Sequence, residues 1–293
     1  MFAERSLIVF WWSQGSGVSR DIREHYTEGK WIMELFQYQQ RPYNLILREL
    51  CLALNNTLQD IIGIYLHGSL AMNCHTFNRS DIDIIAVVDT DSNSKRELRF
   101  LIEQLMDIES KYDTSIEISV VSKRSIRCFI HPSRFILHYS KSHRDRYLND
   151  PDYFCGPGVD PDLAAHFFMV EKRGVVIYGQ EIGSMFKGDY EDAYWDSVLR
   201  DISCEIEDTG DNHIYLILNY CRTLMYLITG EVGSKLEGGL WFLDNMKSEF
   251  CSLVESAILG YQGQTYGDFD IQEIKDFREN VLALCGFMFE DRA

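Results

Sequence analysis

The first half of the chain alternates between apolar runs of strand length and longer segments with helical spacing. Leucines recur at helical intervals over 43–59, which predicts a helix. Apolar, β-branched runs predict strands over 61–66, 81–88 and 116–121. Between the last two runs, residues 94–111 are amphipathic and begin with Ser94 and Glu97, the spacing of a capping box. This order of elements predicts a sheet covered by helices.

The second half of the chain is dominated by helical spacing. Proline and glycine gather at 150–160, which predicts a linker. Helices are expected over 161–173, 190–207, 212–229, 236–262 and 271–288. We therefore predict an α+β protein. Its parts are an N-terminal extension of unclear role (1–40), a mixed sheet with helices (41–155), and a C-terminal all-α helical bundle (156–293).

Composition and charge narrow the function classes. No apolar run has the length of a membrane helix and the N-terminus lacks a signal-peptide pattern, so a cytoplasmic protein is expected. The eight cysteines form no CxxC pair, which favours reduced thiols over a zinc site. The net charge of −17 disfavours a nucleic acid partner. Acidic residues gather over 189–211, where Arg200 is the one basic residue, and an acidic cleft would attract a cationic ligand.

Two carboxylates lie close together at the start of the second predicted strand, in Ser80-Asp81-Ile82-Asp83. Alternate side chains of a strand share a face, so Asp81 and Asp83 point the same way, about 6–7 Å apart. Two ionised carboxylates at that spacing repel each other, and a divalent cation removes the repulsion. Mg²⁺ is bound by one or two carboxylates together with nucleotide phosphate oxygens. The pair therefore predicts a metal site on a rigid strand.

A glycine–serine pair, Gly68-Ser69, precedes this strand and follows another. Glycine lets the backbone approach a ligand closely, and the Ser69 hydroxyl and nearby helix amides can bind phosphate oxygens. Two metal ions held by such carboxylates can bridge the attacking and leaving oxygens of an in-line displacement at phosphorus. A third carboxylate is expected from a neighbouring strand, where Glu117 would act as general base and metal ligand.

Several separated motifs carry a family resemblance. They are 64–72 with 80–83, 135–140, 160–166, 173–179, 218–222, and Ser234-Lys235 with Trp241. In this order they resemble the streptomycin/spectinomycin adenylyltransferases of the polymerase-beta-like nucleotidyltransferase superfamily. The resemblance spans about 50 to 285, and it implies a nucleotidyltransferase domain at 41–155, a C-terminal helical domain and ATP between them.

The resemblance also assigns roles. It implies metal and base functions for Asp81, Asp83 and Glu117. The residues that it implies for nucleotide binding are Gly68, Ser69, Ser80, Arg222, Lys235 and Tyr261. Arginine and lysine can neutralise charge that develops on a transferred phosphate.

For the acceptor, the resemblance points to the residues before the 218–222 motif, Asp208, Asp211 and Asn212, although Asn212 stands where a carboxylate is often found. The streptomycin-modifying branch has a tryptophan where this chain has the segment 141–143, Lys-Ser-His. This departure favours spectinomycin. We interpret His67 and His75, which flank the glycine–serine pair, as structural.

The sequence therefore predicts a magnesium-dependent adenylyltransferase, with two Mg²⁺ ions and ATP as co-substrate. It would act as a monomer on a cationic, aminoglycoside-type acceptor and confer antibiotic resistance. Two alternatives stay open. One is a nucleotidyltransferase acting on a different small molecule, a protein or a nucleic acid, and the other is a non-catalytic ATP-binding module.

Overall fold

The computed structural model describes residues 42–76, 80–89, 93–204, 206 and 210–290, without the side chains of 210–211 and 287–290. All described residues belong to one compact unit. The predicted N-terminal extension, 1–40, and Asp208 lie outside the described residues.

A mixed five-stranded sheet forms the centre of the described fold, in the order β5-β3-β2-β1-β7. Its strands are β1 (Ile61–His67), β2 (Asp81–Val88), β3 (Ser115–Ser122), β5 (Leu137–Tyr139) and β7 (Val175–Gly179). β2 and β3 run parallel, and the other neighbours are antiparallel. The parallel pair is joined by a helix, as a crossover requires. The predicted mixed sheet is confirmed.

The chain returns to this sheet after the segment predicted as a linker. Within that segment, β6 (Gly158–Asp160) pairs with β4 (Ser133–Phe135) in a second, two-stranded sheet. Beyond it, β7 adds to the edge of the main sheet beside β1. The predicted boundary at 155/156 therefore lies between strands of one sheet, because β7 pairs with a strand far away in the sequence.

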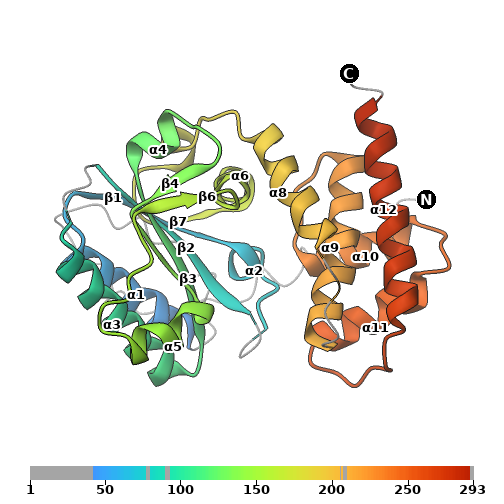
Figure 1. The fold of residues 1–293 in the computed structure, drawn as a ribbon, viewed down its shortest axis with the longest axis horizontal. Helices are drawn as coiled ribbons and strands as arrows, with labels where there is room; N and C mark the ends of the chain where they lie inside the picture. Colours follow the sequence, from blue (N-terminus) through green and yellow to red (C-terminus); the bar gives the residue numbers. More distant parts are fainter. Residues whose placement is uncertain (1–41, 77–79, 90–92, 205, 207–209, 291–293) are drawn as a thin grey trace, which may run out of the picture. The chain divides into compact units, whose positions relative to one another are not determined.

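Helices cover both faces of the sheet (Figure 1). α1 (Tyr43–Thr57) and α3 (Lys95–Tyr112) pack together on one face, and α6 (Leu163–Arg173) lies on the other. The capping box predicted at the start of α3 is present, since the Ser94 hydroxyl accepts from the amide of Glu97 and the Glu97 carboxylate accepts from that of Ser94. Shorter helices are α2 (Gly68–Ala71), α4 (Lys123–Arg127), α5 (Lys141–Asn149) and α7 (Ile182–Met185).

The alternation of side chains along β2 divides the α6 face into a polar and an apolar part. Ile85 and Val87 share this face with Asp81 and Asp83, because they are separated from them by even intervals. The two apolar residues join the hydrophobic core that contains Phe167 of α6. The apolar end is thus sealed against a helix, while the acidic end is left for a site.

The remaining chain forms packed helices, as predicted. They are α8 (Glu191–Ser203), α9 (Gly210–Thr229), α10 (Lys235–Asn245), α11 (Cys251–Tyr261) and α12 (Ile271–Glu290). The single helix predicted over 236–262 is instead two, α10 and α11, because the backbone becomes extended at Met246. No helix in the described residues is long and apolar enough to span a membrane.

One buried carboxylate ties α3 to the edge of the sheet. The Glu109 side chain is buried and accepts hydrogen bonds from the amide of Ile116 (2.9 Å) and the hydroxyl of Tyr139 (2.6 Å). It also forms an ion pair with Arg144 of α5. Because all these donors converge on one buried group, its charge is matched locally.

We expect Glu109→Gln to lower the free energy of unfolding by about 2–3 kcal/mol, because it removes the buried charge that Arg144 and Tyr139 satisfy. Urea denaturation followed by circular dichroism measures the change. Glu103→Gln, at an exposed position of the same helix, is the matched control. Equal stability of the two variants would contradict this account.

Candidate active site

The pairing of three strands brings the predicted carboxylates together. In the parallel pair β2 and β3, Asp83 lies directly beside Glu117, and on its other side Asp83 pairs with His67 of β1. Residues paired across strands point to the same face, so Glu117 faces the same way as Asp81 and Asp83. All four side chains line one pocket. The strand register therefore puts Glu117 on the same face as Asp81 and Asp83, as the sequence predicted.

This arrangement concentrates negative charge. Burial raises the pKa of Asp81, and the charge of Glu117 acts in the same direction. Burial raises the pKa of Asp83 well above its usual range, reinforced by the charges of Glu117 and Asp81. The site is therefore costly to ionise without positive charge nearby.

The start of α2, directly after β1, fits closely against this cluster. Gly68 has a φ of +65°, and a Cβ at this position would lie 1.8 Å from Oδ2 of Asp83. No other residue fits here without moving that carboxylate. The backbone of Ser69 hydrogen-bonds to Asp83, while the buried Ser69 hydroxyl has no hydrogen-bond partner among the described residues. That hydroxyl is available to a ligand in the pocket.

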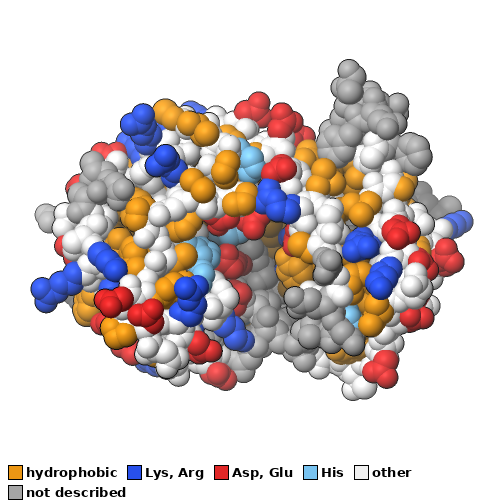
Figure 2. Space-filling view, viewed as in Figure 1, with side chains coloured by type: hydrophobic (Ala, Val, Ile, Leu, Met, Phe, Trp, Pro, Cys, Tyr) orange, Lys and Arg blue, Asp and Glu red, His pale blue; other side chains and the backbone are white. Residues whose placement is uncertain are grey.

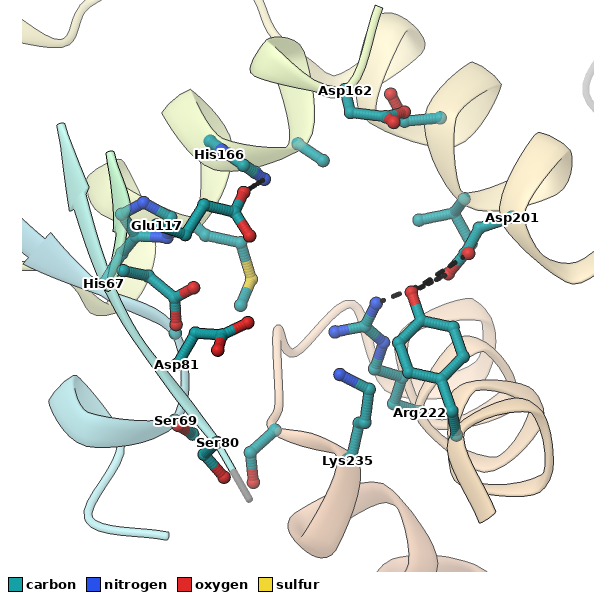
Figure 3. Close-up of a pocket in the computed structure, with 18 of the residues that line it drawn as sticks. His67, Ser69, Ser80, Asp81, Glu117, Asp162, His166, Asp201, Arg222 and Lys235 are labelled. Carbon is teal, nitrogen blue, oxygen red and sulfur yellow. Dashed lines mark hydrogen bonds and ion pairs between the residues drawn. The ribbon is translucent and has the colours of Figure 1, made fainter. Parts of the chain in front are cut away.

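The pocket has a volume of about 900 Å³ and is lined by side chains from the sheet and from α6, α8, α9, α10 and α11. In Figure 2, acidic and histidine side chains gather where this face is hollowed. Figure 3 shows Asp81 and Glu117 on one wall and Arg222 and Lys235 on the opposite wall. Every residue predicted for the metal, the base or the nucleotide lines this single pocket.

Lys235 is the first residue of α10, and that helix start is firmly held. Ser234 and Glu237 form a capping box, and Arg173 donates to the Glu237 carboxylate (2.8 Å) and to the carbonyl of Val232 (2.9 Å). Burial lowers the pKa of Lys235 to about 8, helped by the charge of Arg222 and opposed by Asp83 and Asp201.

Tyr261, at the end of α11, connects that helix to the segment before β2. Its hydroxyl donates to the carbonyl of Cys74 (3.3 Å), and its own carbonyl accepts from the Thr76 hydroxyl (3.4 Å). The Ser80 hydroxyl accepts from the amide of Thr76 (3.2 Å). Tyr261 and Ser80 therefore both hold the loop that leads to the carboxylates.

Of the residues predicted to bind the acceptor, the structure describes the side chain of Asn212 alone. Asp208 lies outside the described residues, Asp211 is described by its backbone alone, and Asn212 is half-buried but not a lining residue. Other carboxylates do line this pocket: Asp160, Asp162 and Asp201. Sequence reasoning missed them, although 160–166 was one of the motifs that carried the resemblance.

Histidines surround Glu117. Nε2 of His166 lies 3.8 Å from Oε1 of Glu117, and the ring centroids of His166 and His67 are 4.9 Å apart. His138 also lines the pocket and bonds to the Ser119 hydroxyl (2.9 Å). Burial lowers the pKa of His67 well below its usual range, with the charge of His166 acting the same way. His67 therefore lines the pocket and is not only a core residue. The contacts of His138 with Ser119 and of His166 with Glu117 join residues from different elements, so they depend on how β5 and α6 pack against β3.

His75, in contrast to His67, does not line the pocket, and its Nδ1 forms a hydrogen bond with the Tyr43 hydroxyl (2.9 Å). Burial lowers its pKa to about 4. A structural role, as interpreted from the sequence, agrees with this tie between α1 and the loop after α2.

The chemistry of the site fits a hard divalent cation. Among the residues that the structure describes, no group of three or more His, Cys, Asp or Glu side chains is arranged as a ready metal site. Mg²⁺, however, needs one or two protein carboxylates, with substrate phosphates and waters completing its coordination. Asp81 and Asp83 offer such oxygens beside the unpartnered Ser69 hydroxyl.

Comparison with known proteins agrees with this arrangement. Residues 47–142 match the nucleotidyltransferase domain family, and residues 186–288 match the family described as aminoglycoside adenylyltransferase, C-terminal domain. The chain is 27% identical over 214 residues to spectinomycin 9-adenylyltransferase of Staphylococcus aureus strain N315, covering 70% of this chain and 79% of that protein. The same figures hold for the protein of strain Mu50.

A solved structure shares the fold. The spectinomycin adenyltransferase AAD(9) from Enterococcus faecialis, determined with ATP and spectinomycin, superimposes with a TM-score of 0.68 at 18% sequence identity. The match covers 81% of this chain and 98% of that one. With two family matches in chain order and the carboxylates of both strands on one face, this chain belongs to the aminoglycoside adenylyltransferase family and is a nucleotidyltransferase.

Proposed function

We propose that this enzyme transfers AMP from ATP to a hydroxyl of a cationic, aminoglycoside-type antibiotic, with spectinomycin favoured over streptomycin. The observation that carries the proposal is the pairing of Asp83 with Glu117, which puts three carboxylates in a pocket opposite Arg222 and Lys235. Negative groups for a metal and a base on one wall, and positive groups for phosphates on the other, are what nucleotidyl transfer requires.

The nucleotide side of the proposal rests on charge. Arg222 and Lys235 would bind the β- and γ-phosphates, whose charge increases as pyrophosphate leaves. The Ser69 hydroxyl, buried and without a partner among the described residues, would donate to a phosphate oxygen. Asp81 and Asp83 would hold two Mg²⁺ ions, which would neutralise charge on the phosphates.

The reaction is a displacement at the α-phosphorus. The acceptor oxygen forms a bond to the α-phosphorus while the bond from that phosphorus to the bridging oxygen of the β-phosphate breaks, and pyrophosphate leaves. Glu117 would take the proton of the acceptor hydroxyl as general base. His166, 3.8 Å from Glu117, is close enough to orient the carboxylate toward the acceptor.

The acceptor side is negatively charged. Asp160 and Asp162 line the pocket, and a cationic acceptor would be attracted to them. Asp208, Asp211 and Asn212 remain proposed acceptor ligands from the resemblance. The 27% identity to a spectinomycin 9-adenylyltransferase supports spectinomycin, as does Lys-Ser-His at 141–143, where streptomycin-modifying relatives have tryptophan.

We further propose that the pocket lies in a cleft between a nucleotidyltransferase domain and a helical domain. This is supported by lining residues from β2 and β3 as well as from α8, α9 and α10. Because all the proposed groups come from one chain, the enzyme would work as a monomer, and its use of ATP suits a cytoplasmic location.

The first experiment is an acceptor screen. Purified protein is incubated with ATP, Mg²⁺ and a panel that includes spectinomycin and streptomycin, and each acceptor is examined by mass spectrometry for the gain of one AMP. We expect spectinomycin to gain AMP and streptomycin to stay unmodified. If neither antibiotic gains AMP and another small molecule or a protein does, the proposed acceptor class is wrong.

The carboxylate variants test the mechanism. We expect Glu117→Gln to lower kcat by about 10²–10⁴-fold, the usual contribution of a general base. Asp83→Asn should lower kcat by a similar factor. Asp89→Asn should keep the parental kcat, because Asp89 is exposed and lies just after the same strand. Thermal melts establish that each variant is folded. A folded Glu117→Gln variant with parental kcat would remove Glu117 as the base.

The pKa of Lys235 gives ATP binding a pH dependence. Because this pKa is lowered to about 8, the ammonium is charged below that pH and loses its charge as the pH rises. We expect KM for ATP to rise about tenfold between about pH 7 and pH 9.5. Lys235→Arg should flatten this profile, since a guanidinium stays charged over the range. The same steep profile in Lys235→Arg would assign the titration to another group.

A further inference from the structure

One carboxylate of the pocket is held by side chains of a neighbouring helix. Asp201 of α8 accepts hydrogen bonds from the hydroxyl of Tyr215, at 3.1 and 3.2 Å from its two oxygens, and from Nδ2 of Asn219 at 2.7 Å. Its Oδ2 also lies 3.8 Å from the Arg222 guanidinium. Figure 3 shows Asp201 and Arg222 facing each other on the wall opposite Glu117.

The spacing of the three partners explains how one carboxylate can reach them. Tyr215, Asn219 and Arg222 are four and three residues apart on α9, so they lie along one face of that helix. Asn219 and Arg222 are buried or half-buried, which limits the water available to replace Asp201. The contacts therefore connect α8 to a single row of α9 side chains.

This row also reaches the second cation. Nζ of Lys235 lies 4.4 Å from the centroid of the Tyr215 ring, within the range of a cation–π contact. The two cations repel each other, since Arg222 helps to lower the pKa of Lys235, and the negative charge of Asp201 opposes this effect. One carboxylate thus contacts Arg222 directly and reaches Lys235 through the ring of Tyr215.

We infer that Asp201 is a positioning residue, which holds Arg222 and, through Tyr215, Lys235 in the places where they bind the phosphates of ATP. The inference rests on the proposed function. Asp201 is not assigned contact with ATP or with the reacting atoms. Direct binding of a cationic acceptor is less favoured, because both oxygens of Asp201 already accept from Tyr215 and Asn219.

The test is Asp201→Asn, with kcat and the KM values for ATP and for spectinomycin measured separately, and ATP binding measured by calorimetry. Losing the charge that orders two cations should raise KM and Kd for ATP about tenfold, with KM for spectinomycin changed by less than about twofold. Tyr215→Phe, which keeps the ring and loses the hydroxyl, should raise KM for ATP about threefold.

The matched control is Asp196→Asn on the same helix. Asp196 pairs with Arg200 and His131 and does not line the pocket, so its loss should leave both KM values unchanged. Thermal melts establish the fold of each variant. If Asp201→Asn does not fold, Tyr215→Phe and its KM for ATP decide the question.

Three results separate the outcomes. A raised KM for spectinomycin with unchanged ATP binding would overturn the inference and make Asp201 an acceptor ligand. Parental kinetics in Asp201→Asn and Tyr215→Phe, with a parent that binds ATP, would overturn the inference alone. A parent protein that does not bind ATP would overturn the proposed function, and this inference with it.

Discussion

Repulsion among Asp81, Asp83 and Glu117 is the constraint on which the rest of this structure depends. The three carboxylates share one face of two hydrogen-bonded strands, and the parallel register leaves Glu117 no position except beside Asp83. Burial and mutual charge raise the pKa of both aspartates, so the folded chain holds a site that is unfavourable to ionise. Positive charge, from protein or ligand, is needed to stabilise it.

Two features prevent the strands from moving apart to reduce the repulsion among these carboxylates. The apolar residues that follow on the same face, Ile85 and Val87, belong to the core beneath α6. At the other end, Gly68 approaches so closely that a Cβ would meet the Asp83 carboxylate. A rigid strand and a close-fitting turn therefore hold the acidic end in place, as a preorganised site needs.

Lys235, on the opposite wall of the pocket, is also held in place by contacts around it. Lys235 begins a helix whose capping box is connected through Glu237 to Arg173, the last residue of α6. Helix α6 also carries His166, which contacts Glu117. One element, α6, is thus connected at different positions to the proposed base and to the start of α10. The positions of acid and cation depend on shared packing rather than on separate local motifs.

Much of this could be predicted from the sequence alone. Hydrophobic periodicity identified the central strands, and the spacing of Ser94 and Glu97 identified the capping box, because both are local properties of a few neighbouring residues. Period-two alternation placed Asp81 and Asp83 on one face for the same reason. The family was recognisable because its motifs occur in order along the chain, and the residues that it implied for the nucleotide do line one pocket.

What only the tertiary structure decided involves residues far apart in the chain. The pairing of β7 with β1, the contact of His166 with Glu117, and the ties of Asp201 to α9 leave no local pattern, since each depends on how separate elements pack. The break between α10 and α11 was also missed, because apolar spacing continues across it. Periodicity reports which face of an element is buried, whereas the partner that buries it is chosen by the fold.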